Sequence, residues 1–109
     1  MKIPKIKKMK IGSTYYDVEY VDDLRDEGGR MLLGRIFESY HLIKVNTSCS
    51  YQNMLQTLRH ESEHGIMWEY GVNDKERLVT LLSNGHYAFI VDNPELIREI
   101  LKHTERMKK

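Results

Sequence analysis

The sequence predicts an α+β protein in which a small N-terminal antiparallel sheet is followed by three helices. Short β-prone runs fill the first half, the apolar spacing becomes helical beyond Asn46, and helix start and stop signals recur after that point. A chain of 109 residues can bury one modest core but not a second. We therefore expect a single domain spanning 1–109.

Four strand-forming runs precede the helices. The runs 6–11 and 15–21 flank a Gly-Ser-Thr turn, which predicts a β-hairpin. The runs 32–38 and 41–46 flank a second short turn, and the second of them alternates apolar and polar residues. These runs predict an antiparallel sheet of about three or four strands. Because the run 41–46 directly precedes the first helix, we expect it at the edge of the sheet.

The first helix is the longest of the three. Segment 47–50 (Thr-Ser-Cys-Ser) offers hydroxyl groups that can cap a helix N-terminus, and helical periodicity then continues to about Tyr70. Gly71 is well placed to end this helix in the left-handed conformation. Abundant apolar residues flank its polar motif, which predicts a central rather than a peripheral helix: Met54, Leu55, Leu58, Ile66, Met67 and Trp68.

Two further helices are expected. Asn73 or Asp74 should cap a second helix running from 75 to about 90. The third begins with Asn-Pro-Glu at 93–95, where a cap is followed by proline at the first helical position and by an acidic residue. One apolar stripe follows it: Leu96, Ile97, Ile100 and Leu101.

Composition narrows the class of protein. The net charge of +1, with 40% hydrophobic and 30% charged residues, is typical of an ordinary globular protein without general affinity for polyanions. Five of the first ten residues are Lys, the one feature that points to nucleic acid, although a solvated terminus is its commoner meaning. Cys49 is alone, and no secretory signal or membrane-spanning run is present. We expect a cytoplasmic protein without a membrane partner.

The strongest functional signal is His60-Glu61-Ser62-Glu63-His64, a His-Glu-x-x-His pattern inside the first helix. One helical turn separates the two histidines, so both imidazoles lie on one face and can bind one Zn²⁺. Glu61 is next to them and can act as a general base. An exposed helix with solvated His and Glu residues is the alternative meaning, but the apolar flanks favour a metal site.

A catalytic zinc ion usually takes three protein ligands, which raises the question of the third. The short turn at Gly71 should fold the second helix back, so its first turns approach the metal-binding face. Glu76 is the best candidate, although it could instead form a capping arrangement with Asn73. Asp74 can be a cap or a ligand, and His86 would complete an all-histidine site.

The segment from His60 to Val72, followed by 76–85, resembles short phage and prophage proteins of the gluzincin-like type. These are similar to the ImmA/IrrE and minimal-gluzincin metallopeptidases, in which a metal-binding Glu on the next helix follows His-Glu-x-x-His. Segment 93–96 (Asn-Pro-Glu-Leu) resembles the start of their closing helix. The resemblance covers roughly residues 32–101 and implies a zincin-like metallopeptidase domain, in which a sheet edge beside the metal helix receives the substrate backbone.

The resemblance implies that His60 and His64 are zinc ligands, Glu61 is the catalytic general base, and Glu76 is the third ligand. Two departures from the family pattern stand out. Ser62 and Glu63 occupy positions that are often apolar, and His86 stands where Leu is expected. Glu63 could add negative charge to the face of the helix that carries the ligands, and His86 could compete with Glu76 for the metal.

These observations predict a zinc-dependent peptidase of phage or mobile-element type, acting on a protein or peptide substrate in the (host) cytoplasm. The alternative is a protein that binds zinc but does not catalyse a reaction: a zinc-stabilised binding or regulatory module. A nucleic-acid-associated peptidase is a third reading, supported only by the Lys-rich arm. Tyr87, His86 and His41 are candidates for stabilising an oxyanion, and each is more often a packing or surface residue.

Overall fold

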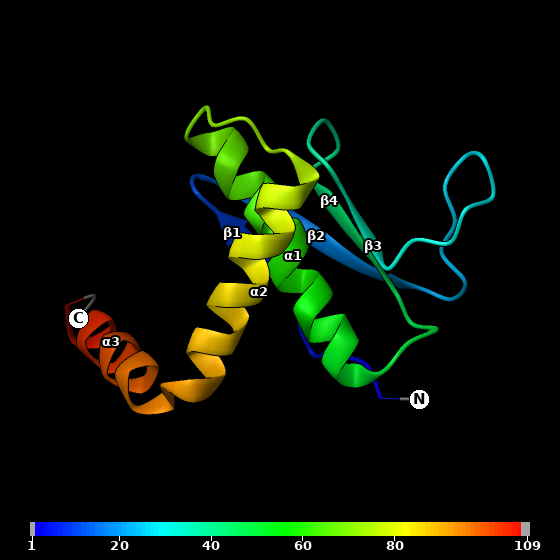
Figure 1. Ribbon diagram of the computed structural model, residues 1–109. Helices are drawn as coiled ribbons and strands as arrows, with labels where there is room; N and C mark the ends of the chain where they lie inside the picture. Colours follow the sequence, from blue (N-terminus) through cyan, green and yellow to red (C-terminus); the bar gives the residue numbers. More distant parts are fainter. Residues whose placement is uncertain (1, 108–109) are drawn as a thin grey trace.

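The computed structural model describes residues 2–107, in which a four-stranded sheet is followed by three helices (Figure 1). The α+β class is therefore confirmed. The strands are β1 (Lys8–Ile11), β2 (Thr14–Val21), β3 (Gly34–Phe37) and β4 (Leu42–Asn46), and the helices are α1 (Tyr51–Glu69), α2 (Glu76–Asp92) and α3 (Pro94–Met107).

The two expected strand pairs are present, but the sheet is mixed rather than antiparallel. β1 pairs antiparallel with β2 across a turn in which Gly12 has φ +60°, and β3 pairs antiparallel with β4 with Ile36 opposite Ile43. β2 and β4, however, run parallel, in the order β1-β2-β4-β3. The loop after β2 carries the chain to the far edge of the sheet, so that β4 returns beside β2 in the same direction. Alternating apolar residues specify the faces of a strand and not the direction of its partner.

The expectation that the run 41–46 forms a sheet edge is wrong. β4 is hydrogen-bonded on both sides, and its residues Ile43 and Val45 are fully buried. The edge strands are β1 and β3, and β3 is the one that has β4 as its neighbour. β4, which directly precedes α1 in sequence, is therefore an interior strand. β3, which precedes β4, contacts α1 at one edge of the sheet.

Helix α1 is central, as predicted. It contacts β1, β3 and β4 on one side and α2 on the other, whereas α2 contacts no strand of the described chain. The molecule thus has three layers, with α1 between the sheet and α2 (Figure 1). Met54 and Leu58 of α1 join Ile43 and Val45 in the core. Gly65 allows close contact because a Cβ there would lie 3.1 Å from Ile11.

The ends of α1 follow the sequence signals. The Ser50 hydroxyl accepts a hydrogen bond from the Asn53 N–H, which confirms that a residue of segment 47–50 caps the helix. Gly71 has φ +69° and donates to the Trp68 carbonyl, while Val72 donates to the Met67 carbonyl. This is a Schellman motif, which ends α1 and turns the chain toward α2.

The starts of α2 and α3 agree less closely with the prediction. The N-cap of α2 is Lys75, which makes no side-chain capping bond, so the expected caps Asn73 and Asp74 are wrong. The Asp74 carboxylate instead accepts hydrogen bonds from side chains of α1. α3 begins at Pro94 as predicted, but the Asn93 side chain donates to a carbonyl of α2 rather than capping α3.

The contact between α1 and β3 gives a stability prediction. At Gly34, an added Cβ would overlap the Thr57 methyl group and lie 3.0 Å from the Lys44 carbonyl oxygen. Gly34→Ala should therefore lower the free energy of unfolding by about 1–3 kcal/mol, the usual cost of overpacking. Urea denaturation would measure the change. A variant as stable as the wild type would show that α1 does not pack directly against β3.

Gly85→Ala is the matched control. Gly85 lies within α2, and an added Cβ there would meet nothing within 4 Å. The same substitution should therefore raise helix stability by up to about 1 kcal/mol, because alanine favours the helix over glycine.

Candidate metal centre

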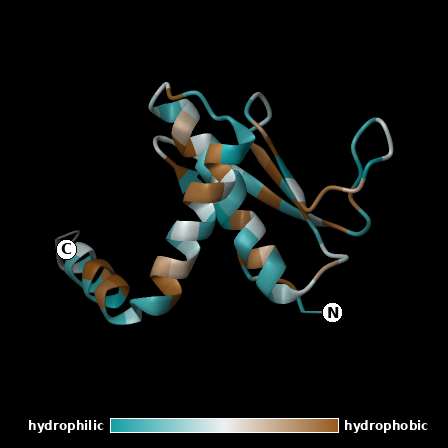
Figure 2. Ribbon diagram, in the orientation of Figure 1, coloured by the Kyte–Doolittle hydropathy of each residue, from teal (hydrophilic) through white to brown (hydrophobic). Residues whose placement is uncertain are grey.

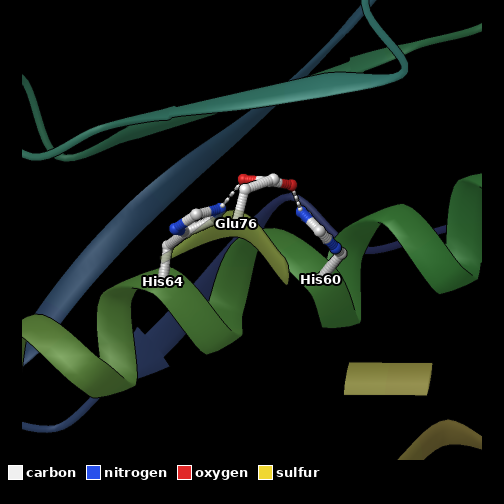
Figure 3. A group of neighbouring side chains, drawn as sticks. All are labelled: His60, His64 and Glu76. Carbon is white, nitrogen blue, oxygen red and sulfur yellow. Dashed lines mark ion pairs between the residues drawn. The ribbon is translucent and has the colours of Figure 1, made fainter. Parts of the chain in front are cut away.

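The candidate site joins two histidines of α1 to the first residue of α2. His60 and His64 lie one turn apart, with ring centroids 5.2 Å from each other. The Glu76 carboxylate lies between the two rings (Figure 3). Its Oε1 is 2.7 Å from His60 Nε2, and its Oε2 is 3.0 Å from His64 Nε2. The Schellman turn at Gly71 produces this arrangement because it directs the start of α2 back over the histidine face.

The other ring nitrogens are already occupied. His64 Nδ1 lies 2.9 Å from Asp74 Oδ2, and His60 Nδ1 lies 3.4 Å from the hydroxyl of the buried Ser83. A proton on each Nδ1 satisfies these contacts and leaves both Nε2 lone pairs facing Glu76. Hydrogen bonding at the second nitrogen commonly fixes the tautomer of a metal-binding histidine.

The donor set fits a zinc ion. Within the described residues, one ligand atom each from His60, His64 and Glu76 lies within 4.8 Å of the other two. Two imidazole lone pairs and a carboxylate are all electron donors, so a cation or protons must lie among them. Two histidines and one glutamate form a common ligand set of catalytic zinc. The Glu76 side chain is 68% exposed, so the group opens to solvent on one side.

Asp74, considered as a cap or a ligand, does not cap α2 and lies outside the group formed by His60, His64 and Glu76. Its carboxylate accepts hydrogen bonds from His64 Nδ1 and, at 2.8 Å, from Trp68 Nε1. The hydrogen bond from His64 lowers the pKa of Asp74, and the indole N–H acts in the same direction. A charged Asp74 therefore orients the imidazole of His64 from the side away from Glu76.

His86 is not next to the two histidines. Its Nδ1 lies 3.3 Å from Glu63 Oε1 and also contacts the Arg59 guanidinium. Glu63 is 4% exposed, and its carboxylate binds Arg59 Nη2 at 2.6 Å. The expectations that Glu63 charges the ligand face and that His86 competes with Glu76 are therefore not supported by this arrangement. Together these three residues form a second polar contact between α1 and α2.

Glu61 lies beneath the edge strand, beside the ligand group. The residue is 7% exposed, and its carboxylate accepts a hydrogen bond from the Ile36 N–H of β3. Burial raises the pKa of Glu61 to about 7; His64 and the Ile36 N–H oppose this rise, and the Glu76 carboxylate adds to it. The environment thus lets this carboxyl group keep its proton to a higher pH than an exposed glutamate does.

A cleft of about 880 Å³ contains the whole group. Segment 33–36, at and just before β3, forms one wall, and His60, Glu61, His64 and Glu76 line the other. The three suggested oxyanion donors lie elsewhere. His41 packs against Tyr16, His86 binds Glu63, and Tyr87 lines a second groove. The cleft therefore combines a candidate metal site, a buried carboxyl group and an edge strand.

Sequence reasoning missed the supporting role of Ser83. Ser83 follows Glu76 by seven residues (83 − 76), or two helical turns, so both lie on the face of α2 toward α1. That spacing could have identified it. The contact of Asp74 with His64 had no comparable signal because it depends on the path of the turn between α1 and α2.

Comparisons with protein families, with curated proteins and with solved structures find no match to this chain. Within residues 2–107, none of the helices combines the length and apolar character needed to cross a membrane.

The environment of Glu61 predicts a pH-dependent stability in the metal-free protein. Between the ordinary value of 4.5 and the folded value of about 7, the folded state holds a proton that the unfolded chain has lost. The free energy of unfolding should therefore fall as the pH rises through this window, by about 3 kcal/mol in total. Urea denaturation at about pH 5 and about pH 8 in the presence of a chelator measures this fall.

Two variants isolate the contribution of Glu61. Glu61→Gln removes the titrating group and should remove this part of the pH dependence. Glu69→Gln, at the exposed end of the same helix, should retain it. Equal pH dependence in the two variants would mean that another group is responsible.

Proposed function

We propose that this protein is a small zinc-dependent peptidase of phage or mobile-element type that hydrolyses peptide bonds in a protein substrate in the cytosol. The observation that carries the proposal is the convergence of His60 Nε2, His64 Nε2 and the Glu76 carboxylate in an open cleft that also contains Glu61. The resemblance to gluzincin-like metallopeptidases supports the same conclusion, as well as a zincin-like fold.

Each residue has a distinct role in this proposal. His60, His64 and Glu76 hold the ion, while Asp74 and Ser83 fix the two rings. A bound Zn²⁺ would lower the pKa of a water molecule and polarise the carbonyl of the peptide bond. Glu61 accepts a proton as general base and returns it to the leaving amine. Its burial keeps bulk water away from this transfer.

The substrate would lie along β3. This strand has a free edge and forms one wall of the cleft, opposite the candidate ligands. An extended peptide can add to such an edge through backbone hydrogen bonds. This role was expected for the run 41–46, but that strand is central, so the proposal now rests on β3.

A zinc-stabilised binding module is the second candidate function. One observation favours it: Glu61 is almost fully buried and already hydrogen-bonded to β3. A carboxylate in this position can act as a structural link between α1 and the sheet rather than as a base. Under this alternative the ion would join α1 to α2 and the cleft would bind a partner without cleaving it.

Metal binding is tested by comparing Glu76 with His86. The wild-type protein should bind one zinc ion per chain, and His60→Ala or His64→Ala should abolish this binding. Glu76→Gln should weaken binding far more than His86→Ala, because Glu76 contacts both Nε2 atoms whereas His86 contacts Glu63. Calorimetric titration with zinc, combined with metal analysis, measures the zinc affinity of each variant and shows which substitution weakens binding more. A stronger effect of His86→Ala would disprove the assigned ligand set.

Catalysis is tested with Glu61→Gln. This change preserves size and polarity but removes the proton acceptor, so zinc binding should persist while hydrolysis falls by about a hundredfold to ten-thousandfold. Cleavage of a partner protein identified from a cell lysate provides the readout, and Glu69→Gln serves as the control. A zinc-loaded wild type that captures its partner without cleaving it would favour the binding module.

A further inference from the structure

Helix α3 and the last residues of α2 form an arm that projects from the three layers (Figure 1). Among the described elements, α3 contacts only α2. Its apolar stripe is therefore uncovered: Leu96, Ile100 and Leu101 are 48%, 51% and 58% exposed. Figure 2 shows hydrophobic residues along α3 and at the adjoining end of α2.

The end of α2 is apolar on several sides. Phe89, Ile90 and Val91 are consecutive and are 50%, 43% and 61% exposed. Consecutive helical residues point about 100° apart, so solvent meets apolar side chains over most of the circumference. A helix that is apolar all round is normally buried. This part of the arm therefore has the composition of a buried helix, although its side chains are exposed to solvent.

The total surface supports the same conclusion. The chain exposes 7955 Å² for a mass of 13.0 kDa. A folded monomer of this mass exposes about 6300 Å², so the excess is about 1600 Å². The radius of gyration is 14.7 Å, compared with about 13 Å for a compact chain of this length. This excess exceeds the roughly 800 Å² per partner of a standard interface and is in the range of obligate homodimers.

A receiving groove lies beside the arm. It has a volume of about 550 Å³ and lies between the start of α1 and the end of α2. Its lining includes Tyr51, Leu55, Ala88 and Val91, and Val91 belongs to the arm as well. α3 does not contact α1, so it leaves the groove of its own chain open.

We propose that the arm mediates a two-fold symmetric dimer, in which α3 of each copy lies in the groove between α1 and α2 of the other copy. The same apolar surfaces are used twice, as an isologous interface requires. Charge favours a second copy over an anionic partner, because the polar side of α3 alternates in sign: Glu95, Arg98, Glu99 and Lys102. A nucleic acid or an acidic membrane would require a positive face.

The test uses two variants that alter opposite sides of the same interface. Ile100→Glu places a carboxylate in the stripe of α3, and Ala88→Glu places one in the groove. Lys102→Glu is the matched control, since it adds the same side chain to the opposite face of α3. All three positions are exposed, so the fold should persist, which circular dichroism and thermal melting would verify.

Sedimentation equilibrium over a range of concentrations measures the mass. The wild type and Lys102→Glu should sediment at twice 13.0 kDa, and each of the other variants should raise the dimer dissociation constant by about a hundredfold or more. A wild type that remains at 13.0 kDa at all concentrations would overturn the proposal. A dimer that persists in both the Ile100→Glu and the Ala88→Glu variants would also overturn the proposal. A monomer that binds phosphatidylserine vesicles would overturn it as well. Dimerisation is measured without metal or substrate, so its failure leaves the proposed peptidase function unaffected.

Discussion

The structure depends on one constraint: α1 is covered on two sides although it carries a run of polar side chains. Covering a polar group is unfavourable unless it is hydrogen-bonded, so each of these residues needs a partner, and three of them find it outside α1. Glu61 finds one on β3, His64 on the turn before α2, and His60 within α2. Within the described residues, every buried side-chain nitrogen or oxygen has a partner. The contacts that satisfy α1 therefore also hold the three layers together.

The parts of this arrangement that depend on neighbouring residues could be predicted from the sequence. The α1 limits follow from Ser50 and Gly71, and the approach of Glu76 to His60 and His64 follows from the short turn between the helices. The sheet order could not be predicted because alternation does not determine whether a strand pairs in parallel or antiparallel. Asp74 was misjudged for a related reason. A carboxylate before a helix usually caps it, but here the turn directs it toward an imidazole.

The candidate site joins two kinds of surface that a peptidase and a binding module would use differently. β3 offers backbone groups at a free edge, and the ligand residues offer a place for a cation across the same cleft. Glu61 touches the first through Ile36 and lies one residue from His60. Its carboxylate therefore contacts the strand and lies close enough to His64 and Glu76 to be affected by their charges. A ligand that moved the edge strand would change the position of the group best placed to take a proton.

The Schellman turn at Gly71 has a consequence for how the chain folds. Because it places the three candidate ligands on consecutive helices, closing the site requires only a short loop, and short loops cost little entropy to close. The parallel pairing of β2 with β4 joins residues 25 positions apart, as Asp17 and Leu42 are, and so costs more entropy to close. The helical hairpin can thus assemble first. A metal ion bound by residues of both helices would then hold the hairpin together independently of the sheet.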